Sequence, residues 1–194
     1  MNTVILSPRL GAMAGIAGSV FFAIMWTAAV FADGSWHLGE MTLSELGDRS
    51  RSGHLLFNTG AMVTGILSLL FSVGLYKVLS PGIIGRAGAA MMGLASLLLI
   101  GVGLFPIDTG TPHTVVSLSF FGIAALAMVL FIVPFARSYV FHPSMAMFTA
   151  FLLLVCLVGA AILKLPGLEA LAVGCLLLWM FVVSIRMMWH HPAR

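Results

Sequence analysis

The sequence contains few charged residues, because only 8% of its 194 positions are Asp, Glu, Lys or Arg. A soluble domain carries about 25% charged residues, and so small a share cannot cover a surface that faces water. The shortage excludes an ordinary soluble globular domain. The nine Lys and Arg residues are also scattered, whereas a nucleic-acid-binding surface needs clustered basic residues. We therefore expect no nucleic-acid partner.

Motifs for redox, metal and hydrolytic chemistry are also missing. The two cysteines, Cys156 and Cys175, lie inside apolar runs without Cys-x-x-Cys spacing, so neither a redox motif nor a zinc site is indicated. The sequence has no His-x-x-x-His or His-Glu-x-x-His pattern, and no Gly-x-Ser-x-Gly elbow. We expect the cysteines to be small apolar packing residues.

Apolar residues make up 61% of the chain and form long runs. A helical span needs about 20 residues, and six runs have nearly that length: 10–32, 55–79, 87–105, 115–135, 145–163 and 170–189. They predict an all-α integral membrane protein with six transmembrane helices that form one domain over 1–194. No ionisable residue lies at mid-span, which disfavours a proton or ion pump.

The charges divide unequally between the two sides of such a bundle. Six basic residues fall on the side of the amino terminus: Arg9, Lys77, Arg86, Arg137, Arg186 and Arg194. Three fall on the other side, namely Arg49, Arg51 and Lys164, together with all six acidic residues. The excess of Lys and Arg predicts cytoplasmic amino and carboxyl termini in the cell membrane. The acidic side would then be the outer face.

The longest connection, residues 33–53, contains the pattern of a short helical turn. Thr42 can cap it, Glu45 follows three residues later as in a capping box, and Gly47 can end it. Trp36 can anchor the segment at the level of the lipid headgroups. We expect this helical turn to lie over the outer mouth of the bundle.

Polar residues on the outer face supply the candidate site. His54 and Asn58 are four residues apart, so they share one face of the second span. Asn58 must face the bundle or a wet cavity, because burying an unpaired amide costs free energy. Asp108 and His113 lie at the ends of neighbouring spans and can approach each other. With Glu45, these residues are our candidates for binding. Asp108, His113 and Glu45 are the candidates for catalysis.

Three short motifs resemble one known family. They are Leu43-Ser44-Glu45-Leu46-Gly47, then Phe57-Asn58, and then Gly101-Val102-Gly103-Leu104-Phe105-Pro106, which His113 and Phe120-Phe121 follow. This pattern is similar to that of the domain-of-unknown-function 998 family of prokaryotic multi-pass membrane proteins, over about residues 10–185. The resemblance implies a six-helix bundle and points to Asn58, Pro106 and His113. It implies no particular activity.

Three functions remain open. We favour a membrane protein that binds a lipid or a small amphiphile in an outward-facing cavity, because small-molecule sites combine apolar walls with few polar groups. The alternatives are a lipid-acting enzyme that uses the same outer-face residues, and a structural or accessory subunit of a membrane complex. A divalent metal could be held by His54, His113 and Asp108, whose nitrogen and oxygen atoms are suitable ligands. The expected partners are membrane lipid and a second protein or a second copy of the chain.

Overall fold

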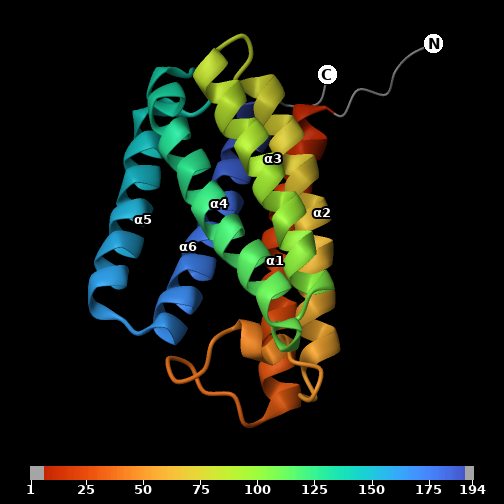
Figure 1. The fold of residues 1–194 in the computed structure, drawn as a ribbon. Helices are drawn as coiled ribbons and strands as arrows, with labels where there is room; N and C mark the ends of the chain where they lie inside the picture. Colours follow the sequence, from red (N-terminus) through yellow and green to blue (C-terminus); the bar gives the residue numbers. More distant parts are fainter. Residues whose placement is uncertain (1–6, 191–194) are drawn as a thin grey trace, which may run out of the picture.

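The computed structural model describes residues 7–190, so Arg194 of the charge count lies outside it. Six long helices make up the fold (Figure 1), and the described residues form no strand. The helices are α1 (Pro8–Asp33), α2 (His54–Val78), α3 (Ile83–Leu104), α4 (Thr111–Arg137), α5 (His142–Ile162) and α6 (Leu165–His190). Two 3₁₀ helices, η1 (Ser44–Gly47) and η2 (Ile107–Thr109), lie in the connections after α1 and α3.

Each of the six helices is long and apolar enough to cross a membrane. The all-helical prediction is therefore confirmed, and the six predicted runs correspond to the six helices. The helix ends extend past the apolar runs, because capping and turn residues such as Thr111 and Leu165 already belong to the first helical turn. The fold is that of a multi-pass membrane protein.

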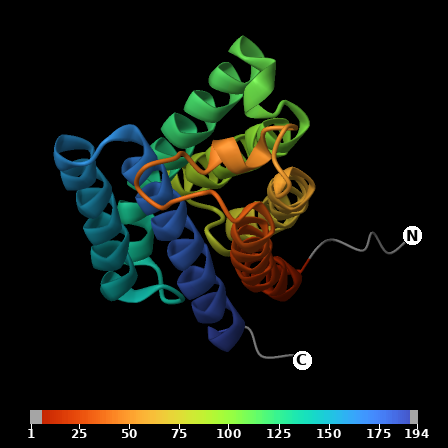
Figure 2. The same ribbon diagram turned by 90° about the horizontal axis from the view of Figure 1, so that it is seen from below.

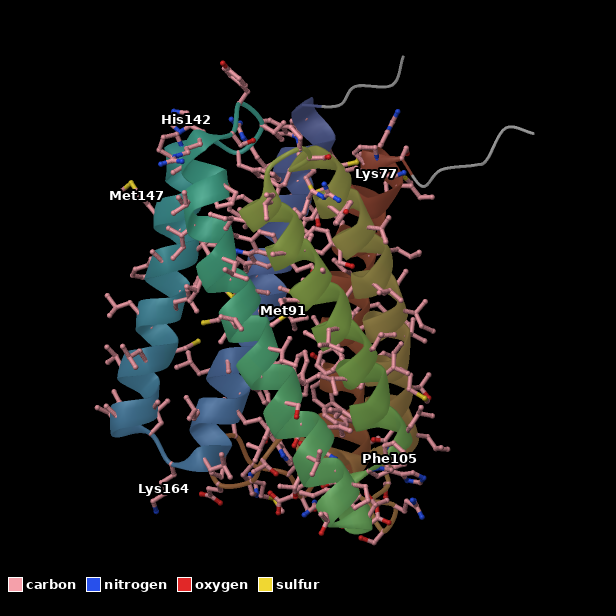
Figure 3. All side chains as sticks on the ribbon, turned by 45° about the horizontal axis from the view of Figure 1, so that its top comes forward. Lys77, Met91, Phe105, His142, Met147 and Lys164 are labelled. Atoms are coloured by element: carbon pink, nitrogen blue, oxygen red, sulfur yellow. The ribbon has the colours of Figure 1, made fainter. Side chains whose placement is uncertain are left out.

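The helices run up and down, so the bundle has two distinct ends (Figure 1). We call the end that carries η1, η2 and the α5–α6 connection the loop end. The opposite end, which carries both ends of the described chain, is the terminal end. Figure 3 labels Phe105 and Lys164 at the loop end, and Lys77 and His142 at the terminal end. All six acidic residues belong to loop-end segments: Asp33, Glu40, Glu45, Asp48, Asp108 and Glu169.

Small residues let α1 approach α2 and α6 closely. A Cβ atom added to Gly11 would lie 2.7 Å from Cα of Gly74 in α2. One added to Gly18 would lie 3.2 Å from Cβ of Leu67. Gly15 faces Ser184 and Phe71 in the same way. These glycines therefore allow close helix packing, which gives one side of the bundle a rigid frame.

Aromatic rings join α4 and α6 near the terminal end. The rings of Phe131 and Phe135 stack with centroids 5.2 Å apart, and Phe131 stacks on Trp179 of α6 at 5.5 Å. The indole Nε1 of Trp179 donates a hydrogen bond to Oγ1 of Thr149 in α5, at 2.9 Å. Because the N–H group of the indole has this hydrogen-bond partner, Trp179 can be buried without leaving a polar group unsatisfied. These contacts hold α4, α5 and α6 together in their terminal halves.

Candidate functional site

A cavity of about 450 Å³ lies between the loop-end halves of α4, α5 and α6. Its volume is in the usual range for small-molecule sites. The wall is mostly apolar, with residues such as Phe121, Met128, Leu152 and Leu176. Its polar side chains come from the strap (residues 34–53, which include η1), α4 and α6, namely Thr42, Ser44, His113, Thr114, Ser117 and Glu169.

The cavity follows from how α4 and α6 cross. Their aromatic contacts lie toward the terminal end, and their loop ends lie apart in both views (Figures 1 and 2). On α4 the lining residues Ser117, Phe121, Ala125 and Met128 recur every three or four positions, so one helix face meets the cavity. Ala172 of α6 leaves space opposite that face. Short side chains between diverging helices thus leave a volume that the bundle does not fill.

The cavity also reaches the outer surface of the bundle. Leu118 of α4 and Leu165 of α6 both line it, yet they are 65% and 66% exposed. In a helix that crosses a membrane, exposed leucine contacts lipid tails rather than water. An apolar chain could therefore enter from the side of the bundle.

Glu169 of α6 connects the strap to this cavity. Its Oε2 accepts a hydrogen bond from the backbone N–H of Leu43 at 3.0 Å. Its Oε1 accepts from the N–H of Ser44 at 3.3 Å and from the Ser44 hydroxyl at 2.6 Å. Figure 2 shows the strap running across the loop end toward the start of α6. The carboxylate thus fixes η1 as one wall of the polar end.

The last apolar run in the sequence predicted a span that begins at residue 170, and the structure begins this helix five residues earlier. Helix α6 begins at Leu165, so Pro166 is its second residue. Proline is well suited to this position, because the first amide groups of a helix have no intrahelical partner. Glu169 therefore lies in the helix and lines the cavity rather than lying in a loop. The Pro166-Gly167 pair looked like a turn, although Pro near the first position of an apolar run is also a signal for the start of a helix.

His113 is the one residue of the predicted site that lines the cavity. It is 5% exposed, and its Nδ1 lies 2.8 Å from the carbonyl oxygen of Phe105. A carbonyl can only accept, so Nδ1 carries the proton and donates. The ring is near enough to Glu169 for the two side chains to interact electrostatically. In the neutral ring, Nε2 is left as an acceptor.

Glu45 and Asn58 hold the strap in shape and do not line the cavity. Glu45 Oε2 accepts hydrogen bonds from the N–H and the hydroxyl of Thr42, at 2.5 and 3.0 Å. Asn58 is buried, and its Nδ2 donates to the carbonyl oxygen of Gly47 at 2.9 Å. The predicted need of Asn58 for a buried partner is thus met by the backbone of η1 rather than by His54.

Asp108 and His54 also point to local partners. Asp108 forms an ion pair with Arg49 at 3.4 Å, and Nδ1 of His54 lies 2.6 Å from the carbonyl oxygen of Arg51. Asp108 and His113, which were expected to approach each other, thus each make a polar contact with another residue. Among residues 7–190, no group of three or more His, Cys, Asp or Glu side chains is placed to hold a metal ion. His54, His113 and Asp108 therefore do not form a metal centre in this structure.

The loop end of the bundle carries more acidic than basic residues. Arg51 pairs with Asp33 at 3.0 Å, so its charge is matched by an acid at the end of α1. The hydroxyl and the backbone N–H of Ser50 donate to Asp48 and lower the pKa of that carboxyl below its usual value. Asp48 therefore stays ionised at neutral pH. Six acidic residues face three basic ones at this end of the bundle.

A comparison of the sequence with known protein families identifies the family of this chain. The family described as protein of unknown function (DUF998) matches residues 16–186. The chain belongs to the DUF998 family. This span includes all of the cavity and its strap. No match is found among curated proteins or among solved structures.

The motifs that resemble the DUF998 family meet at one place in the structure. Gly47 ends η1 and receives the hydrogen bond of Asn58. A Cβ atom on Gly103 would lie 2.5 Å from the backbone oxygen of Asn58, so α3 passes close to α2 there. Phe105 receives the hydrogen bond of His113. The motifs therefore build the frame that supports the strap and the amino end of α4 at the cavity.

Proposed function

We propose that this DUF998 protein binds a lipid or a small amphiphile in the cavity between α4, α5 and α6. The observation that carries the proposal is the division of the cavity wall. One end has hydroxyls, an imidazole and a carboxylate, and the rest is aliphatic, aromatic or sulfur-containing. An amphiphile has the same division, with one polar group and one apolar chain.

The exposed leucines beside the cavity support entry from the membrane. A lipid chain in the bilayer is already out of water, so moving it into an apolar cavity gains little hydrophobic free energy. The polar end must then provide most of the selectivity, because a hydrogen bond formed there replaces poorer contacts in the bilayer. Glu169 and His113 are the residues placed to provide it.

We further propose that the loop end faces the outside of the cell, with both termini in the cytoplasm. The support is the distribution of Lys and Arg, which favour cytoplasmic segments. Arg9, Lys77, Arg86, Arg137 and Arg186 all lie in terminal-end segments of the described chain. The cavity would then take its ligand from the outer leaflet of the cell membrane.

Filling the cavity tests the proposal. Ala172 lines the cavity, whereas Ala160 of α5 is exposed and does not line it. We expect Ala172→Trp, in nanodiscs, to lose most of the binding of a fluorescent single-chain amphiphile, and Ala160→Trp to keep it. Equal binding by the wild type and Ala172→Trp would show that the probe binds elsewhere. Mass spectrometry of the recovered probe separates binding from an enzymatic change, since a binding protein returns it unaltered.

A further inference from the structure

Hydroxyl groups from the strap line the polar end of the cavity, but their protons are already used. The Ser44 hydroxyl donates to Glu169 at 2.6 Å. The Thr42 hydroxyl donates to Oε2 of Glu45 at 3.0 Å. A hydroxyl has one proton, so neither group can donate to a ligand without breaking a bond that holds the strap.

The side-chain protons of the lining residues at the amino end of α4 are also engaged in hydrogen bonds. The hydroxyl of Thr114 donates to the carbonyl oxygen of Gly110 at 3.2 Å, and that of Ser117 donates to the carbonyl oxygen of Thr114 at 3.3 Å. The Nδ1 proton of His113 is engaged by Phe105. Among the described lining residues, the remaining side-chain protons are those of Cys156 and Cys175, whose thiols are weak donors and interact with each other.

Several hydrogen-bond acceptors at the polar end, by contrast, remain free for a ligand. A carboxylate has about four lone-pair positions, and Glu169 uses three of them for Leu43 and Ser44. When the His113 ring carries only its Nδ1 proton, Nε2 is a second acceptor. The hydroxyl oxygens of Thr114 and Ser117 can also accept. No Lys or Arg is among the described residues that line the cavity. The side chains of the polar end therefore offer acceptors and one full negative charge.

We propose that the ligand is an amphiphile whose headgroup donates hydrogen bonds and carries no negative charge, such as a long-chain alcohol or amine. This inference rests on the proposed function. A hydroxyl or ammonium group satisfies the free acceptors of Glu169 and His113. An anionic headgroup would leave them unsatisfied and would face a carboxylate with no lining Lys or Arg to compensate. Placing like charges next to each other is a general way of rejecting the wrong partner.

The amino ends of α4 and α6 do not reverse this preference. Each helix end presents about half a positive charge, which by itself would favour an anion. Glu169 lies in the second turn of α6 and brings a full negative charge to that end. At α4, the polar side chains of the first turns already direct their protons to backbone carbonyls. On the α6 side of the polar end, where Glu169 lies, the balance is therefore negative.

A competition experiment with chains of equal length tests the inference. Dodecanol, dodecylamine and dodecanesulfonate, which stays anionic at neutral pH, compete with the fluorescent amphiphile for the wild-type protein in zwitterionic nanodiscs, below solubilising concentrations and corrected for partitioning. We expect the alcohol and the amine to displace the probe at least about tenfold more effectively than the sulfonate, a difference of about 1.4 kcal/mol.

The outcomes separate the two proposals. If the sulfonate competes as well as the alcohol and the amine, the headgroup inference fails while the amphiphile site stands. If the probe itself does not bind, the proposed function fails. A substitution adds a second readout: Glu169→Gln should reduce the discrimination against sulfonate. Glu40→Gln, in an exposed acid of the same strap that does not line the cavity, should preserve it.

Discussion

The hydroxyl of Ser44 and the carboxylate of Glu169 lie 2.6 Å apart, although 125 positions separate them in the sequence. The bond joins the strap between α1 and α2 to the first turns of α6. Because α4, α5 and α6 form the rest of the cavity, this contact and the two backbone hydrogen bonds to Glu169 make the two parts of the chain share one site. Their loss should open the polar end before it unfolds the bundle.

We therefore expect Ser44→Ala to loosen the strap. A hydrogen bond to a charged group contributes about 1.5–3 kcal/mol, and Ser44 is buried. The local opening free energy of the strap should fall by about that amount, because only two of its three hydrogen bonds to Glu169 remain. Hydrogen exchange of residues 42–48 in nanodiscs measures it.

Ser52→Ala is the matched control, since Ser52 lies on the same connection and is exposed. Exchange in Ser52→Ala should equal that of the wild type. A double-mutant cycle with Glu169→Gln isolates the pair. If the effects of Ser44→Ala and Glu169→Gln simply add, the two side chains are not coupled and the contact does not hold the strap.

Gly47 provides a second test of the strap. A Cβ atom at this position would lie 2.5 Å from Oδ1 of Asn58 and 3.0 Å from the ring of Phe57. Overpacking of a filled site costs about 1–3 kcal/mol, so Gly47→Ala should lower the melting temperature. Gly122→Ala is the control, because no atom lies within 4 Å of a Cβ atom there. Equal melting temperatures for the two variants would contradict the packing of η1 on α2.

The six helices could be predicted because the length and apolarity of a segment are enough to identify a membrane span. The aromatic contacts could not, since nearly every residue of these helices is apolar and periodicity does not separate the buried face from the lipid face. Trp179 is buried at 1% exposure while Trp189 of the same helix is 77% exposed. Only the crossing of α4 and α6 distinguishes them.

The sequence placed the candidate site at the loop end, where the cavity lies, but four of its five residues do not line the cavity. Charge counting selected the loop end, and His113 does line the cavity. Asp108 and Asn58 were chosen as polar residues near span ends, yet they bind Arg49 and the backbone of Gly47. Distinguishing a polar group that a neighbour satisfies from one that faces a cavity needs the tertiary contacts. Those contacts join residues far apart in the sequence.

Helix packing at α1 gives a third prediction. A Cβ atom on Gly11 would lie 2.7 Å from Cα of Gly74, and a backbone atom cannot move aside by rotating a side chain. Gly11→Ala should therefore push α1 from α2 and destabilise the bundle by about 1–3 kcal/mol. Gly174→Ala has open space and serves as the control. Reversible unfolding in mixed micelles measures the stability of both variants. If Gly11→Ala had the same free energy of unfolding as the wild type, α1 and α2 would pack less closely than the structure shows.

The orientation in the membrane can be tested with two cysteine substitutions at opposite ends of the bundle. Ser52 is exposed at the loop end, and Tyr139 is 100% exposed at the terminal end. If Lys and Arg set the orientation, a membrane-impermeant maleimide should label Ser52→Cys in intact cells. Tyr139→Cys should be labelled only after the cells are lysed.

The wild type is the blank for this measurement, because Cys156 and Cys175 lie inside α5 and α6, where a water-soluble reagent has little access. The reverse pattern, with Tyr139→Cys labelled in intact cells and Ser52→Cys protected, would place the strap and its acidic residues in the cytoplasm. The cavity would then take its ligand from the inner leaflet. Its donor-selective polar end would be unaffected, since that selectivity depends on Glu169 and His113 and not on the side of the membrane.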